Sequence, residues 1–135
     1  MGPPQRQLKI KNEELRMAKD ENLIQNKSYA FAIRMVNLFQ HLSKKKNEFV
    51  LSKQLLRCGT AIGANVEESI GGQSRADFIA KMSIAYKEAR ETLYWLRLLH
   101  DTHYLSQPEF ESLFTDADEL CRILSSILTT TKKNT

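Results

Sequence analysis

Apolar side chains recur every three or four positions along most of this chain, the spacing that places them on one side of an α-helix. Polar and glycine-containing stretches divide the pattern into helices expected near residues 26–45, 52–70 and 75–102, and from residue 107 onward. Helices of similar length joined by short connections indicate an all-α fold. We therefore expect an antiparallel up-down-up-down four-helix bundle.

Residues with strong end preferences mark the limits of these helices. Ser52 and Ser74 are expected to cap the second and third helices, because a serine hydroxyl accepts from a free backbone N–H in the first turn. Residues 106–109, Ser-Gln-Pro-Glu, form a capping box that predicts the start of the last helix. Gly71 and Gly72 should end the second helix.

The first helix is apolar over an unusually large part of its circumference. One stripe is buried in any amphipathic helix, but here two adjoin, which predicts either a central helix or one shared between its own core and a neighbouring subunit. The first stripe holds Tyr29, Ala32, Ile33, Val36 and Phe39, and the second holds Phe31, Met35, Leu38 and Leu42.

The two ends of the chain lack this pattern. Residues 1–21 mix both charge signs with few apolar positions, so we expect a flexible N-terminal arm. Residues 22–131 should form the bundle as one domain, and residues 132–135 a frayed tail.

The second helix contains two glycines one turn apart. Gly59 and Gly63 each cost a helix about 1 kcal/mol relative to alanine, so a close neighbour should require them. We expect this seam to face the third helix or a second subunit. Asn65 and Glu68 are expected to fix the contact by hydrogen bonds.

Composition and charge narrow the possible partners and compartment. The 135 residues are 41% hydrophobic and carry a formal net charge of +4, which is compatible with a polyanionic partner. Cys58 and Cys121 occupy apolar helical positions, as expected of buried thiols in a reducing compartment. With no apolar run long enough for a bilayer and no signal peptide, a cytoplasmic protein without membrane contact is expected.

No familiar catalytic or metal-binding motif emerges from the sequence. A di-metal site in a bundle of this kind requires Glu-x-x-His on two helices, and that spacing does not occur. His100 and His103 lack a third local ligand. We therefore expect no catalytic residues, no metal and no cofactor.

Basic residues recur along the second and third helices and are candidates for binding phosphates. Alternatively, they pair with Glu67, Glu68, Glu88 and Glu91 in a salt-bridged surface. The candidates are Arg57, Arg75, Lys81, Lys87, Arg90 and Arg97.

Residues 56–69 (LRCGTAIGANVEES) and 74–99 (SRADFIAKMSIAYKEARETLYWLRLL) resemble a bacterial family named for proteins encoded in intervening sequences of 23S ribosomal RNA, often labelled ribosomal proteins. The resemblance implies a small bundle that assembles as a ring-like homopentamer with no known enzymatic activity. It also implies a structural role for Gly63, Asn65 and Glu68. Accessory proteins of diversity-generating retroelements are related bundles that bind nucleic acid and a reverse transcriptase.

The leading hypothesis is a non-enzymatic oligomeric bundle associated with RNA or nucleoprotein through its basic helix surfaces. Its rival is a structural module that binds a protein, for example a reverse transcriptase, through the wide apolar first helix without touching nucleic acid. A metal-dependent enzyme is the least expected.

Overall fold

The computed structural model describes residues 3–72 and 74–133, and it assigns most of them to α-helices. The helices are α1 (Pro3–Lys46), α2 (Leu51–Ile70), α3 (Arg75–Asp101) and α4 (Gln107–Lys133), and the described part contains no strand. The predicted all-α fold is confirmed. None of the described helices has an apolar stretch long enough to cross a membrane.

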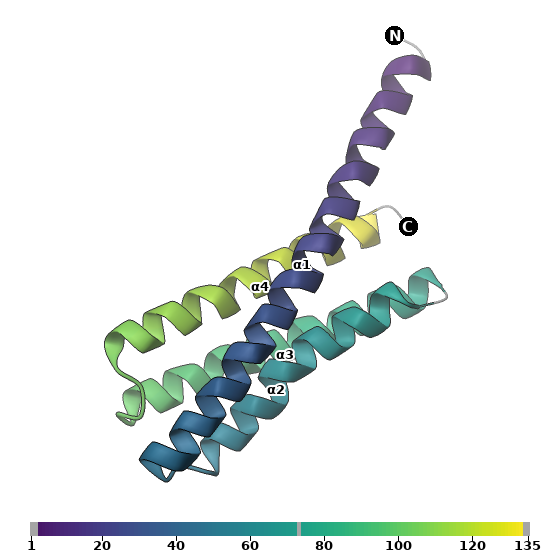
Figure 1. The fold of residues 1–135 in the computed structure, drawn as a ribbon. Coiled ribbons are helices and arrows are strands. Elements are labelled where there is room, and N and C mark those ends of the chain that lie inside the picture. The colour runs from purple at the N-terminus through teal and green to yellow at the C-terminus, as the bar shows by residue number, and fades with distance from the viewer. Residues whose placement is uncertain (1–2, 73, 134–135) are drawn as a thin grey trace.

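The helices pack in the order in which they follow one another along the chain. Consecutive helices run in opposite directions (Figure 1), and α1 and α3 each contact both α2 and α4. Among the described residues, the backbones of the diagonal pairs α1/α3 and α2/α4 do not come close to each other. This arrangement fits the up-down-up-down bundle.

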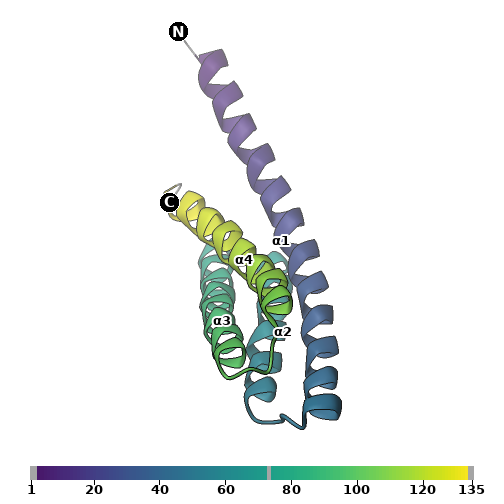
Figure 2. The same ribbon diagram turned by 90° about the vertical axis from the view of Figure 1, so that its left-hand side faces the viewer.

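Residues 3–21 are helical and continue into the packed part of α1, whereas the sequence predicted a flexible arm over residues 1–21, helical at most near its end. α1 is one continuous helix from Pro3, and its N-terminal part projects beyond the bundle (Figure 2). Once the packed part has nucleated a helix, each added residue costs little, and this segment is rich in helix-forming Gln, Lys, Glu, Arg and Leu. α4 likewise continues through Lys133, so residues 132 and 133 of the expected tail are helical. Residues 1–2 and 134–135 lie outside the described part.

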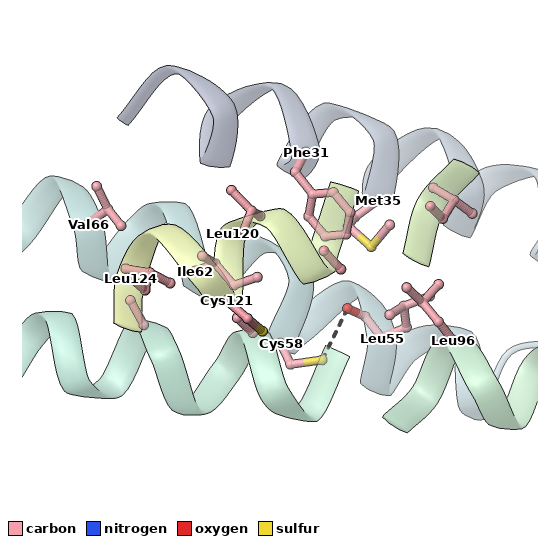
Figure 3. Packing of buried hydrophobic residues seen from close by; sticks show 14 of the residues in the cluster. Phe31, Met35, Leu55, Cys58, Ile62, Val66, Leu96, Leu120, Cys121 and Leu124 are labelled. Carbon is pink, nitrogen blue, oxygen red and sulfur yellow. Dashed lines mark hydrogen bonds between the residues drawn. The ribbon is translucent and has the colours of Figure 1, made fainter. Parts of the chain in front are cut away.

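The two apolar stripes of α1 have different environments. Phe31 and Met35 are buried in the core between the helices (Figure 3), and Leu42 is buried as well. The core stripe of α2 that packs with them consists of Leu55, Cys58, Ile62 and Val66. In contrast, Ile33 is 50% exposed and Tyr29 is 67% exposed. The second stripe therefore builds the core, whereas much of the first is open on the outer side of α1.

The glycine seam of α2 faces α1, which corrects the expectation that it faces the third helix or a second subunit. A Cβ atom on Gly63 would lie 3.3 Å from the carbonyl oxygen of Ser28, and one on Gly59 would lie 2.5 Å from Cγ of Met35. Ser28 and Met35 are two turns apart on α1. Gly63 thus allows the backbones of α1 and α2 to approach closely, and Gly59 makes room for the Met35 side chain.

Two of the expected helix caps are confirmed. The Ser74 hydroxyl accepts from the N–H of Asp77 at 3.0 Å. At the start of α4, the Ser106 hydroxyl accepts from the N–H of Glu109, and the Glu109 carboxylate accepts from the N–H of Ser106 at 2.9 Å. α2 also ends where expected, with Gly71 at its C-cap.

Ser52 does not cap α2, because Glu48 takes that role. The Glu48 carboxylate is almost completely buried and accepts from the backbone N–H groups of Val50, Leu51 and Ser52, the last at 2.6 Å. The Ser52 hydroxyl instead donates to the Glu48 carbonyl oxygen at 2.8 Å. A carboxylate here also matches the positive end of the α2 dipole.

Replacing Glu48 with glutamine should lower the free energy of unfolding by about 1 kcal/mol at neutral pH, the usual magnitude for a helix cap. Burial raises the pKa of Glu48, but the N–H donors of Ser52, Leu51 and Val50 outweigh it and hold that pKa below the ordinary 4.5. Because the pKa of Glu48 is lower in the folded than in the unfolded protein, its carboxylate stabilises the fold at pH values above the unfolded-state pKa. This contribution is lost as the pH falls through the folded-state pKa.

Urea unfolding of both proteins at pH 7 and at pH 3 measures this effect. The difference between wild type and Glu48→Gln should shrink at pH 3, while the depressed pKa of Glu109 affects both proteins equally and cancels. An equal difference at both pH values would show that the Glu48 charge is not involved.

Candidate nucleic-acid interface

Two of the six candidate basic residues are neutralised by carboxylates across the α2–α3 contact. Arg57 forms ion pairs with Glu88, at 3.4 Å, and with Glu91. Lys81 lies 3.8 Å from Glu68. For Arg57 and Lys81 the structure supports the salt-bridged alternative, which makes them weaker candidates for binding an external phosphate.

The Glu91 carboxylate joins this surface to an aromatic side chain. It also accepts from the indole N–H of Trp95 at 2.9 Å. The exposed ion pairs of Arg57 and Lys81 each contribute at most about 1 kcal/mol to stability, so they orient α2 and α3 more than they hold them together.

Arg75 lies in acidic surroundings at the start of α3. It lines a cleft of about 450 Å³ together with Glu13, Glu14 and Glu21 of α1. Because three carboxylates line the same cleft as this arginine, the cleft is poorly suited to a phosphate. The sequence alone did not indicate this cleft, because residues 13–21 were not expected to pack against the bundle.

Lys87, Arg90 and Arg97 form a separate group on the outer side of α3. All three are exposed, and among the described residues none of them has an ion-pair partner. Positions 87, 90, 94 and 97 are three or four apart, so they share one side of the helix. We call Lys87, Arg90, Tyr94 and Arg97 the basic stripe.

Tyr94 places an aromatic ring between these cations. The ring is 55% exposed and packs edge-on against Trp95, with ring centroids 5.0 Å apart. At 1.5 Å per residue the stripe extends over about 15 Å, the length of several phosphates along one strand. Exposed cations around an accessible ring are suited to contact both phosphates and bases.

Asn65 and Glu68 do not lock the glycine seam. The Asn65 amide donates to the carbonyl oxygen of Ala61 at 2.8 Å, within its own helix, and the expected bond across helices is not made among the described residues. Glu68 is exposed, and within the described part of the chain it reaches α3 through its ion pair with Lys81. The close contact of α1 and α2 depends instead on the glycines.

Both cysteines are free and buried, as predicted. Burial raises the pKa of Cys58 and of Cys121 to about 11, although a hydrogen bond from Thr92 lowers that of Cys58 slightly. Each thiol is therefore protonated near neutral pH and is a weak nucleophile. Across the described part of the chain, no three His, Cys, Asp or Glu side chains gather closely enough to hold a metal ion.

Comparison with known proteins places this bundle in a family. Residues 20–126 match the family model of the 23S rRNA-intervening sequence proteins. The chain belongs to this family. A solved structure from the S23 ribosomal protein family of Bacteroides thetaiotaomicron, a protein of unknown function, is 49% identical, with a TM-score of 0.80. No curated protein matches the sequence.

The N-terminal part of α1 lies outside the family match, which begins at residue 20. The alignment with the Bacteroides protein covers 98% of that chain but 82% of this one. The basic stripe and the glycine seam lie within the matched region, whereas most of the projecting part of α1 does not.

Proposed function

We propose that the protein is a non-enzymatic, self-associating bundle of the cytoplasm that binds RNA or an RNA–protein complex through the basic stripe. The observation that carries this proposal is the separation of the cations into two groups. Arg57 and Lys81 are neutralised by carboxylates, whereas Lys87, Arg90 and Arg97 are exposed on one side of α3 without such partners among the described residues.

Simple electrostatics explains why such a stripe favours a nucleic acid. Each lysine or arginine that contacts a phosphate releases counterions, so affinity grows with the number of contacts. Tyr94 adds a surface on which an unpaired base can stack. A symmetric assembly would repeat the stripe on every subunit and thus multiply the contacts.

The outer face of α1 supports self-association. Tyr29, Ile33 and Val36 are 67%, 50% and 42% exposed and follow one another along one side of the helix. Exposed apolar residues in such a row are typical of a surface that another protein covers. A homopentamer is the assembly that the family resemblance implies.

The same face favours a second candidate function, a structural module that binds another protein without contacting nucleic acid. In that case Tyr29, Ile33 and Val36 would contact the partner, for example a reverse transcriptase, and the basic stripe would stay solvated. The two functions differ in whether RNA holds the complex together.

Purification from the native host, with and without RNase, distinguishes them. We expect light scattering to give a mass several times the 15.6 kDa of one chain, and we expect RNase to release bound RNA and any protein held through it. A protein partner retained after complete digestion would favour the module. A monomer without RNA would contradict the proposal.

A further inference from the structure

The part of α1 that projects beyond the bundle exposes apolar side chains to water. We call residues 7–21 the overhang. Leu8 is 62% exposed and Leu15 is 60% exposed, two turns apart on the same side. An isolated helix of this length is marginal in water, so burying its side chains against another molecule would stabilise it.

The charges of the overhang are divided between two sides. Leu8, Lys11, Leu15 and Lys19 are three or four positions apart and form a basic, apolar side, all of it exposed. Glu14, Met17 and Glu21 have the same spacing on a different side, and they line the cleft that Arg75 and Thr131 close from α3 and α4. Each overhang thus carries a cationic side and an anionic cleft.

The acidic cleft is suited to an incoming cation. Burial raises the pKa of Glu21, because its negative charge is partly removed from water. A cationic side chain entering the cleft would offset that cost. Arg75 already occupies one wall, and the cleft of about 450 Å³ has space for further side chains.

We propose that the overhang binds a second copy of this chain: the side with Leu8, Lys11, Leu15 and Lys19 packs against the Glu14–Glu21 cleft of the other copy. Every copy carries both surfaces, so the contact is made either reciprocally by two copies or successively around a ring. The leucines supply apolar burial and the charges fix the orientation.

The charge balance of the overhang favours this occupant over RNA. Residues 7–21 hold four cations and four anions, so the segment has no excess charge for a polyanion. The acidic cleft would repel phosphates, whereas it complements the basic side of another copy. Most of the overhang lies outside the family match, and the proposal does not depend on RNA binding.

Charge reversal tests this contact in the full-length protein. Lys11→Glu/Lys19→Glu reverses the basic side, and Glu14→Lys/Glu21→Lys reverses the cleft. Sedimentation velocity over a dilution series in low salt measures the protein concentration below which the assembly dissociates. This concentration should be about tenfold higher for each variant than for wild type. Lys45→Glu/Lys53→Glu changes the net charge as Lys11→Glu/Lys19→Glu does, on exposed positions away from the overhang, and should behave as wild type.

An equimolar mixture of the two overhang variants is the decisive sample. The reversed basic side of one variant faces the reversed cleft of the other, so the mixture should dissociate at a clearly lower concentration than either variant alone. The proposal is overturned if both variants dissociate as wild type does, or if mixing restores nothing. It is equally overturned if Lys11→Glu/Lys19→Glu weakens only RNA binding.

Discussion

Replacing Gly63 with leucine should lower the melting temperature by roughly 10 °C and separate α1 from α2. The new side chain would meet the Ser28 backbone, where even a Cβ atom lies 3.3 Å from the carbonyl oxygen. A backbone carbonyl cannot rotate aside, so the helices must move apart and open the core around Phe31 and Ile62. The higher helix propensity of leucine relative to glycine offsets only about 1 kcal/mol of this loss of stability.

Two further variants isolate the cause of this effect. Gly63→Ala adds only the Cβ atom, so a propensity gain of about 1 kcal/mol should nearly cancel the strain. Ala64→Leu adds the same side chain at the next, exposed position and should leave the melting temperature within a few degrees of wild type. A Gly63→Leu protein that melts as wild type does would refute the close contact of α1 and α2.

Neutralising the basic stripe should weaken binding to structured RNA strongly. We expect Lys87→Gln/Arg90→Gln/Arg97→Gln to raise the dissociation constant at least about tenfold at low salt, because three phosphate contacts per subunit are lost. The exposed side chains make little packing contribution, so the fold should be unchanged. Fluorescence anisotropy with a labelled RNA hairpin measures the change.

The paired cations provide a control taken from the structure itself. Arg57→Gln/Lys81→Gln also removes positive charge, but from residues whose charge Glu88, Glu91 and Glu68 already offset. We expect the dissociation constant to rise by less than about threefold. An effect equal to that of the basic-stripe variant would show that the two groups of cations do not differ in function.

Local sequence patterns predicted most of the bundle because short-range physics decides those features. The caps at Ser74 and at Ser106 depend on residues three positions apart, and both form as expected. The buried stripe of α2 follows from helical spacing alone. Patterns within one helix are therefore readable without knowing its neighbours.

Features that depend on a second element were not predictable in this way. Glu48 caps α2 from a turn in which Asn47 adopts a φ of 54°, and no local motif indicates that turn. The glycines signalled a close contact, but spacing within α2 cannot tell α1 from α3. The overhang was missed because its helix continues from the packed part of α1 without a core of its own.

The candidate interface shows the same division. All six candidate basic positions are on α2 or α3, as the helical spacing predicted. Whether a cation is neutralised depends on which carboxylate faces it across the helix contact, as Glu88 faces Arg57. Only the packed structure separates Lys87, Arg90 and Arg97 from the rest.

The salt dependence of RNA binding tests the central claim most directly. Wild type should retain a structured RNA at low salt, and the logarithm of its affinity should fall linearly with the logarithm of the salt concentration. The basic-stripe variant should show a shallower slope, by about 2 for each subunit that contacts the RNA. No retention of RNA by wild type at the lowest salt, or equal slopes for the two proteins, would contradict the proposed function.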